Sequence, residues 1–358
     1  MSYRRILITG GAGFIGSSYA IWLARHLEGA QITAVDNLKR RGSELNLPRL
    51  RAHGIEFVHG DIRNPEDLQL DARKPEIVVE CSAEPSVLAG YGAGGAYVVQ
   101  TNLVGTANCL ELARRCGADV LFLSTSRVYP IAALNSIRAT ESDKRFEIAE
   151  AQELPGVSRR GIAETFPLHG ARSLYGATKL ASELLLHEYA DMYGLRVVIN
   201  RCGVVAGPWQ MGKVDQGVFA LWVAAHRFQK PLSYVGWGGE GKQVRDLLYI
   251  DDLCRLLDIE LARMDALNGQ VFNVGGGPEA AASLLETTAY CEMITGNRLM
   301  IRSDPKTRAG DVRLYVTDNA LITAQTGWQP RFGVEQSLSA IDQWIVENEA
   351  VVRHLWQP

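Results

Sequence analysis

The stretch RILITGGAGFIGSSYAIWLARHL, residues 5–27, decides the fold. Its first five residues are largely apolar and β-branched or leucine, which predicts a buried strand, and a helical pattern follows from Ser17 onward. Gly10 permits a tight turn between the two, Gly13 lets the backbone approach a pyrophosphate, and Gly16 allows close packing of helix against strand. The strand–turn–helix context favours a dinucleotide site, with the phosphates over the helix N-terminus, over a glycine-rich turn without a ligand.

An acidic residue at the end of the next apolar run, Gln31 to Val35, indicates which dinucleotide binds. Asp36 lies twenty residues beyond the last glycine, where a carboxylate accepts hydrogen bonds from the adenosine ribose hydroxyls. Because a carboxylate repels a 2′-phosphate, we expect NAD rather than NADP. The basic run Lys39 to Arg41 could neutralise such a phosphate, although basic runs in loops are more often solvated. After a third apolar run, Asp61 and Ile62 are expected to hold the edge and face of the adenine.

The composition excludes several classes of protein. The chain has 358 residues, 47% hydrophobic and 22% charged, with a formal net charge of -3, which fits a globular protein of one large or two coupled domains without a nucleic-acid partner. No apolar stretch reaches the ~18 residues needed to span a membrane, and no leader is expected before the first strand. No metal site is expected. The six cysteines are scattered without paired spacing, so we expect reduced thiols in a cytoplasmic protein.

Strands and helices alternate along most of the chain. Helices are expected over residues 96–115, 175–193, 215–228, 284–294 and 334–348, and further strands over 76–80, 119–123, 196–201, 244–250 and 270–274. This alternation predicts an α/β fold, a Rossmann-like doubly wound parallel sheet with helices on both faces, followed by a smaller C-terminal α/β domain that binds the substrate.

The expected domain boundaries follow from the same pattern. Residues 1–203 and 245–275 are expected to form the NAD-binding domain, and residues 204–244 and 276–358 the second domain. The segment Thr140 to Arg172 has no clear period and is expected to be a long functional or mobile loop.

Tyr175 and Lys179 are the candidate catalytic pair. A spacing of four residues places a phenol and an ammonium group on one face of a helix. The cation favours ionisation of the phenol, so a tyrosine with an ordinary pKa of about 10 becomes a usable base. The spacing alone is common in helices, and its value comes from the nucleotide-binding motif that precedes it.

The order of these motifs resembles that of the extended short-chain dehydrogenase/reductase family of nucleotide-sugar enzymes over essentially the whole chain. The motifs that carry the resemblance are Gly10 to Gly16, Asp36, Asp61, Asn102, Ser124 to Tyr129, Tyr175, Lys179, Arg201 to Pro208, and Arg245 with Asp246. Within that family, short motifs look most like the CDP-paratose (CDP-tyvelose) 2-epimerases. These are Asp36 to Leu38 with Arg41 and Gly42, Asn46 with Leu47, His59 to Asn64, Asp215 to Gly217, and Gly241 to Asp246.

The resemblance implies roles for individual residues. Thr125 takes the place of the residue that hydrogen-bonds the reacting sugar oxygen, Tyr175 that of the base, and Lys179 that of the residue that binds the nicotinamide ribose. The residues implied to bind NAD are Gly10, Gly13, Phe14, Ile15, Gly16, Asp36, Asn37, Asp61, Ile62, Ser82, Asn102, Tyr175 and Lys179.

Substrate contacts are implied in the same way. Arg245 and Arg308 match the arginines that grip the diphosphate of a CDP- or UDP-linked sugar, a task that suits bidentate guanidinium groups, and Gln216 is implied to lie near the nucleotide or sugar. The plainer alternatives are a surface loop arginine for Arg308 and, for Thr125, a hydroxyl that satisfies a strand end. The resemblance also implies a homodimer through the helices expected over residues 96–115 and 175–193.

Departures from the family pattern narrow the chemistry. Dehydratases and decarboxylases of the family have an acidic residue soon after the threonine, where this chain has Ser126 and Arg127. That leaves redox epimerisation or simple reduction. The resemblance to the 2-epimerases implies epimerisation at C2 of a CDP-3,6-dideoxyhexose, and the alternatives are epimerisation at C4 of a UDP-hexose, a net dehydrogenase or reductase, and a non-enzymatic NAD-binding role. Other departures affect the expected sugar contacts: Glu80 replaces a histidine, Pro130 a glycine and Val204 an asparagine of many relatives.

Overall fold

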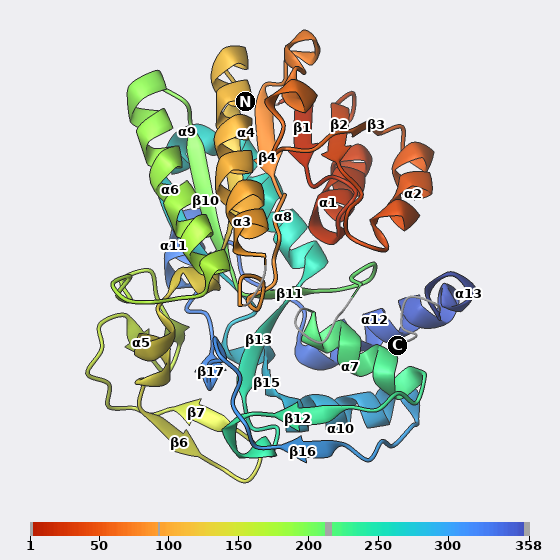
Figure 1. Ribbon diagram of the computed structural model, residues 1–358, viewed down its shortest axis with the longest axis vertical. Helices are drawn as coiled ribbons and strands as arrows, with labels where there is room; N and C mark the ends of the chain where they lie inside the picture. The colour runs from red at the N-terminus through yellow and green to blue at the C-terminus, as the bar shows by residue number, and fades with distance from the viewer. Residues whose placement is uncertain (1–2, 92–93, 212–216, 354–358) are drawn as a thin grey trace. The chain divides into compact units, whose positions relative to one another are not determined.

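The structure of the protein is a computed structural model that describes residues 3–91, 94–211 and 217–353 (Figure 1). The chain forms two compact units. The first contains residues 1–128, 174–201 and 254–272, and the second contains residues 129–173, 202–253 and 273–358. This division differs from the expected boundaries mainly in residues 129–173, which group with the second unit.

A seven-stranded sheet, in the order β14-β10-β5-β4-β1-β2-β3, is the centre of the first unit. The pairs β1·β2, β2·β3, β1·β4 and β4·β5 are parallel. Successive strands run outward from β1 to β3 and then resume on the other side of β1 with β4, which defines a topological switch point. The strands are β1 (Arg5–Thr9), β2 (Gln31–Asp36), β3 (Glu56–His59), β4 (Ile77–Glu80), β5 (Asp119–Thr125), β10 (Val197–Cys202) and β14 (Gln270–Val274).

Helices cover both faces of this sheet, which confirms the doubly wound fold. They are α1 (Phe14–His26), α2 (Leu47–Ala52), α3 (Gly95–Val99), α4 (Gly105–Cys116), α6 (Leu174–Tyr193), α8 (Ile250–Ala262) and α9 (Met264–Leu267). The helix expected over residues 96–115 is interrupted, because a π-helical turn, Gln100–Val104, joins α3 to α4. Helices α3 and α4 lie beside α6 (Figure 1).

Neighbouring residues of β10 show which helices lie on which face. Arg201 donates to Glu183 on α6, whereas Asn200 donates to Glu260 on α8. Successive side chains of a strand point to opposite faces, so α6 and α8 lie on opposite sides of the sheet. Trp22 of α1 donates to Asp258 of α8, so α1 shares the face of α8.

The second unit is built on short strands. Strands β11, β13 and β15 form one sheet in that order, with β17 also paired to β13, and the remaining strands pair as β12·β16, β6·β7 and β8·β9. The strands are β6 (Ala139–Glu141), β7 (Phe146–Ile148), β8 (Val157–Ser158), β9 (Gly161–Ile162), β11 (Val204–Ala206), β12 (Ser233–Val235), β13 (Val244–Tyr249), β15 (Ala281–Ser283), β16 (Arg302–Asp304) and β17 (Leu314–Tyr315). The helices are α5 (Ile131–Asn135), α7 (Val218–Arg227), α10 (Leu284–Thr295), α11 (Ala320–Thr326), α12 (Val334–Glu347) and α13 (Glu349–Val352).

One segment of the second unit differs from the sequence-based expectation. The segment 140–172 contains two antiparallel strand pairs instead of an unstructured loop, and strands of two or three residues are too short to show a period.

Helix α10 begins at a capping box in which Glu286 N donates to Ser283 Oγ, 3.0 Å away, and Ser283 N donates to the Glu286 carboxylate, 2.8 Å away. No helix within the described ranges is long and apolar enough to cross a membrane.

Glu260 is a buried carboxyl group beneath the sheet of the first unit. Asn200 Nδ2 donates to its Oε2 over 2.7 Å, and burial raises the pKa of Glu260 to about 8. The folded protein therefore keeps Glu260 protonated at pH values where an unfolded glutamate, with a pKa of about 4.3, is ionised. Unfolding releases a proton in this interval. The stabilising effect of the bound proton is complete below about pH 4.3 and is lost by about pH 8.

We predict that Glu260→Gln removes this dependence, because an isosteric amide does not titrate. The free energy of unfolding of the parent should lose up to about 1.4 kcal/mol per pH unit from Glu260 alone between the two pKa values. The variant should therefore gain stability over the parent as the pH rises from about 5 to about 8. Urea unfolding at several pH values measures the difference, and parallel curves for parent and variant would contradict the assignment.

Candidate active site

The turn after β1 requires glycine at two positions. Gly10 has a φ of 63°, and a Cβ there would lie 2.9 Å from backbone atoms of Cys81 and Ser82, just after β4. A Cβ on Gly16 would lie 2.2 Å from the carbonyl oxygen of Gly10. The turn thus packs backbone against backbone, and the N-terminus of α1 follows it directly at Phe14. This arrangement fits the pyrophosphate of a dinucleotide, which binds to the free N–H groups of a helix N-terminus.

Asp36 is held in a fixed orientation beside this turn. Ala12 N donates to its Oδ2 over 3.1 Å and Leu38 N donates to its Oδ1 over 2.8 Å. Burial raises the pKa of Asp36, and the hydrogen bonds from the backbone oppose this rise. Each carboxylate oxygen keeps a further lone pair, so Asp36 can accept hydrogen bonds from a ribose.

The residues predicted to contact adenine lie on the neighbouring strand connection. Asp61 accepts hydrogen bonds from Arg63 Nε, 2.9 Å away, and from Asn37 Nδ2, 2.9 Å away. The Arg63 guanidinium holds the pKa of Asp61 well below its usual range. Ile62 is buried against α4, where a Cβ on Gly105 would lie 2.5 Å from its Cδ1. Asn37 and Asp61 are thus brought together beside Asp36.

Tyr97 is a residue of this region that the sequence reasoning missed. Lys39 Nζ lies 4.1 Å from the centre of its ring and the Arg63 guanidinium carbon 5.1 Å from it. Both contacts have the geometry of cation–π interactions. No spacing rule links the three residues, because the contacts join helix α3 to two loops that are distant from it in sequence.

Asn102 lies in the π-helical turn and anchors the loop that carries Ser82. Its Oδ1 accepts a hydrogen bond from Glu84 N at 2.7 Å, and its Nδ2 donates to Glu84 O at 3.1 Å and to Thr178 Oγ1 at 3.3 Å. The side-chain amide of Asn102 therefore makes its hydrogen bonds to protein groups. These bonds connect the loop after β4 to α6. This geometry suits a positioning role, and π-helical turns occur frequently at functional sites.

Thr125, Tyr175 and Lys179 come from two elements that pack together, β5 and α6. Thr125 is the last residue of β5, and Tyr175 is the second residue of α6. All three side chains are largely buried. The carboxyl end of a parallel strand is the usual place for a ligand in such folds, so the structure brings the three predicted catalytic residues to one suitable region.

A buried ion pair fixes α6 against the sheet. Arg201 Nη2 of β10 lies 2.7 Å from Glu183 Oε2 of α6, and Ser124 Oγ of β5 donates to the other carboxylate oxygen over 2.5 Å. Because Glu183 is one helical turn beyond Lys179, these bonds also limit the movement of the face of α6 that carries Tyr175 and Lys179.

Lys179 itself has a carboxylate partner that the sequence reasoning did not identify. Its Nζ lies 3.4 Å from Glu80 Oε2 and 4.3 Å from the centre of the Phe122 ring. Burial raises the pKa of Glu80, and the charge of Lys179 opposes this rise. Glu80 was noted in the sequence only as a departure from the family pattern, since nothing in the sequence connects it to a residue 99 positions later.

The predicted substrate residues of the second unit are partly brought together. Arg245 Nη2 donates to Val312 O at 2.6 Å and contacts Asp311 Oδ1 at 3.2 Å. Arg308 is exposed in the same loop, and its carbonyl accepts a hydrogen bond from Asp311 N. Asp311 therefore links Arg245 to the loop of Arg308. Gln216 lies outside the described residues.

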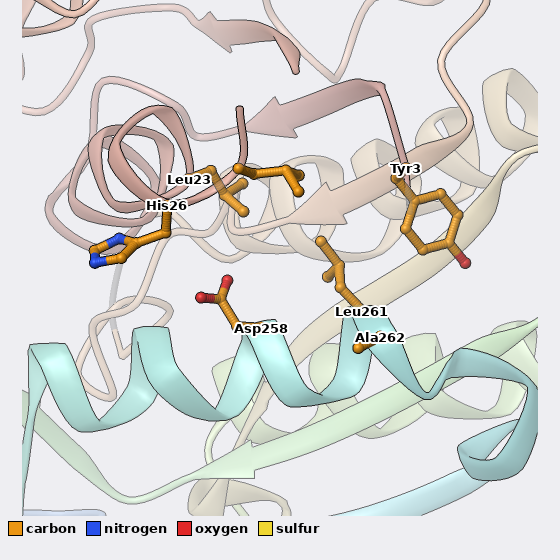
Figure 2. A pocket seen from close by; sticks show the side chains of 7 residues that line it. Tyr3, Leu23, His26, Asp258, Leu261 and Ala262 are labelled. Carbon is orange, nitrogen blue, oxygen red and sulfur yellow. The ribbon is translucent and has the colours of Figure 1, made fainter. Parts of the chain in front are cut away.

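A cavity of about 240 Å³ lies elsewhere in the first unit, between α1 and α8 (Figure 2). Its lining includes Tyr3, which precedes β1 and so marks the amino end of that strand, opposite the Gly10 turn. Ligands of open α/β sheets bind at the carboxyl ends, so this cavity is separate from the cofactor site. Asp258 in its wall is occupied by the indole N–H of Trp22. Within the described part of the chain, no three His, Cys, Asp or Glu side chains gather as metal ligands.

The switch point, the glycine turn and the carboxylate at the end of β2 together define a dinucleotide-binding α/β protein. The family model described as "NAD dependent epimerase/dehydratase family" matches residues 6–275, and the chain belongs to this family. Its membership confirms the family resemblance and NAD as the cofactor.

Relatives within the family differ in the reaction they catalyse. The chain is 29% identical to the CDP-paratose 2-epimerase of Salmonella typhi, covering 95% of this chain and 98% of that protein. It is 30% identical to the dTDP-glucose 4,6-dehydratase of Streptomyces niveus, covering 99% and 95%. The crystal structure of the UDP-glucuronic acid 4-epimerase of Bacillus cereus, in complex with UDP-glucuronic acid and NAD, is 25% identical with a TM-score of 0.79, covering 96% and 99%.

Proposed function

We propose that the protein is a nucleotide-sugar epimerase that works through a transient keto-sugar, most similar in activity to a CDP-paratose 2-epimerase. The observation that carries this proposal is the pair Tyr175 and Lys179 on α6, packed beside β5, whose last residue, Thr125, is followed by Ser126 and Arg127. A dehydratase needs an acid or base at that place for elimination. The likeness to the CDP-paratose 2-epimerase of Salmonella typhi supports the same choice.

The residues of the site have distinct roles in this proposal. NAD, when bound, supplies the hydride acceptor and donor. Tyr175 as phenolate removes the proton of a sugar hydroxyl as its carbon is oxidised to a ketone, and returns that proton when the carbon is reduced from its other face. Lys179 favours the phenolate, and Thr125 hydrogen-bonds the reacting oxygen. Because these groups are held in fixed positions, the reacting atoms meet in the geometry that each step requires.

Arg245 and Arg308 are proposed to bind the diphosphate of the substrate. The guanidinium of Arg245 is held by Asp311 and by the carbonyl of Val312, so its orientation is set before a ligand arrives. Pre-orientation lowers the entropic cost of binding. A UDP-hexose 4-epimerase is the alternative that the likeness to the Bacillus cereus enzyme supports, and a net dehydrogenase or reductase would use the same residues.

We also propose a cytoplasmic homodimer. The six cysteines form no disulfide within the described residues, which supports a reducing environment. Leu184 and Met192 lie on the outer side of α6 with 63% and 64% of their surfaces exposed, and a partner helix would cover them. Sedimentation equilibrium should give twice the chain mass of 39.3 kDa. A mass that stays monomeric at all concentrations would contradict the assembly.

We predict that Tyr175→Phe abolishes turnover and leaves NAD binding and the fold intact. The substitution removes the ionisable oxygen and keeps the ring that is largely buried in α6. General base catalysis contributes typically 10²–10⁴-fold, so the rate should fall by about this factor or more. Single-turnover assays and NAD titration measure the two effects. Near-parental epimerisation by the variant would rule out Tyr175 as the base.

The carbon that is inverted identifies the substrate. A CDP-3,6-dideoxyhexose deuterated at C2 should be epimerised at C2 and keep its deuterium, because the hydride leaves and returns within one active site. NMR of the product measures both the configuration and the label. A UDP-hexose in the same assay is the matched control. Inversion at C4 of the UDP-hexose without action on CDP-sugars would contradict the 2-epimerase proposal, and release of water would identify a dehydratase.

A further inference from the structure

Glu80 and Lys179 form an enclosed pair of opposite charges at the carboxyl end of β4. Glu80 is 0% exposed and Lys179 2% exposed, and 3.4 Å separates Oε2 from Nζ. The second oxygen, Oε1, is buried and has no hydrogen-bond partner within the described residues. A carboxylate is costly to bury, and in the described structure Glu80 has the ammonium of Lys179 and the backbone N–H of Ser82 to offset that cost.

The sheet order places this pair at the nicotinamide end of a bound dinucleotide. Asp36 at the end of β2 marks the adenosine side, and the Gly10 turn after β1 marks the pyrophosphate. Strand β4 is the next strand on the opposite side of β1 from β2. A dinucleotide that spans the switch point therefore extends its other half toward the ends of β4 and β5, where Glu80 and Lys179 meet.

We propose that Glu80 sets the preference of the site for the oxidised cofactor. This inference rests on the proposed function for the placement of NAD. The oxidised nicotinamide ring carries a positive charge and the reduced ring does not. Lys179 alone would repel the oxidised ring in a region of low dielectric constant. The Glu80 carboxylate places a negative charge beside Lys179 that lowers this repulsion, so the oxidised form, with which an epimerisation cycle starts, is retained.

Three of the other groups around the pair are uncharged, and Tyr175, one helical turn before Lys179 on α6, is the ionisable one. Phe122 lies beneath Nζ and is uncharged. Cys109 of α4 is within electrostatic reach of both charges, and burial raises its pKa, which keeps the thiol neutral. Thr9 of β1 lies beside Cys109 and does not ionise. Glu80 is thus the carboxylate beside Lys179, and Tyr175 is the same in every Glu80 variant.

Glu80→Gln is the direct test, with the dissociation constants of NAD⁺ and NADH measured separately on protein stripped of nucleotide. The amide keeps the shape and removes the negative charge. The ratio of the NAD⁺ constant to the NADH constant should rise about tenfold or more, because nothing then offsets the charge of Lys179. Binding of both forms weakened by equal factors would show a merely structural role and overturn the inference.

Three further variants separate charge from packing. Glu260→Gln makes the same chemical change in a carboxyl group that is also 0% exposed but lies on the face of α8, so it should leave the ratio unchanged. Glu80→Asp keeps the charge and should keep the ratio near the parental value. Glu80→Gln combined with Lys179→Met removes both charges and should restore the ratio; a ratio that stays raised would overturn the inference.

Lys179→Met provides the complementary test and does not depend on the folding of Glu80→Gln. This variant leaves Glu80 without its cation, and at high pH, where Glu80 ionises, NAD⁺ should gain affinity relative to NADH. An unchanged ratio at every pH would overturn the inference. The expected shifts in a protein that epimerises no nucleotide sugar would support the role of Glu80 and contradict the proposed function. If the variants weaken NAD⁺ and NADH binding equally and the parent protein is an active epimerase, the proposed function is supported and the role of Glu80 is contradicted.

Discussion

The close approach of the turn after β1 to the backbone after β4 is the constraint on which the rest of the first unit depends. The ideal Cβ position of Gly10 is only 2.9 Å from the backbone of Cys81 and Ser82. Any side chain at Gly10 would force β1 and β4 apart at their carboxyl ends. These ends are where the strand order reverses, so the same contact that excludes a side chain also brings the phosphate-binding turn and Glu80 to one place.

The second requirement is that α6 stays in register with the sheet. Two ion pairs of α6, Glu183 with Arg201 and Lys179 with Glu80, are buried one turn apart. Buried pairs contribute little net stability because of the cost of removing charges from water, but loss of one partner is strongly destabilising. They therefore fix the position of α6 more than they stabilise the fold. Tyr175 lies one turn before Lys179 on the same helix, so its position is fixed as well.

The parts of this architecture that local rules govern could be predicted from the sequence. The strand before Gly10, the helix after it and Asp36 follow from hydrophobic periodicity and glycine spacing, and the structure contains all of them. The π-helical turn at Gln100–Val104 could not be predicted, because one extra residue per turn leaves the helical pattern of the sequence nearly unchanged. The pair Glu80 and Lys179 depends on a contact between segments 99 residues apart, and single-sequence patterns carry no information on such contacts.

Knowledge of that contact strengthens the argument about chemistry. In the sequence, Glu80 is only a departure from the family pattern that affects the expected sugar contacts. In the structure Glu80 is fully buried, and its Oε2 is directed to Lys179. A general acid must come within hydrogen-bonding reach of the group that it protonates. Glu80 meets the ammonium of Lys179 instead, which fits the proposals that its charge acts on the cofactor and that Tyr175 exchanges the proton with the sugar.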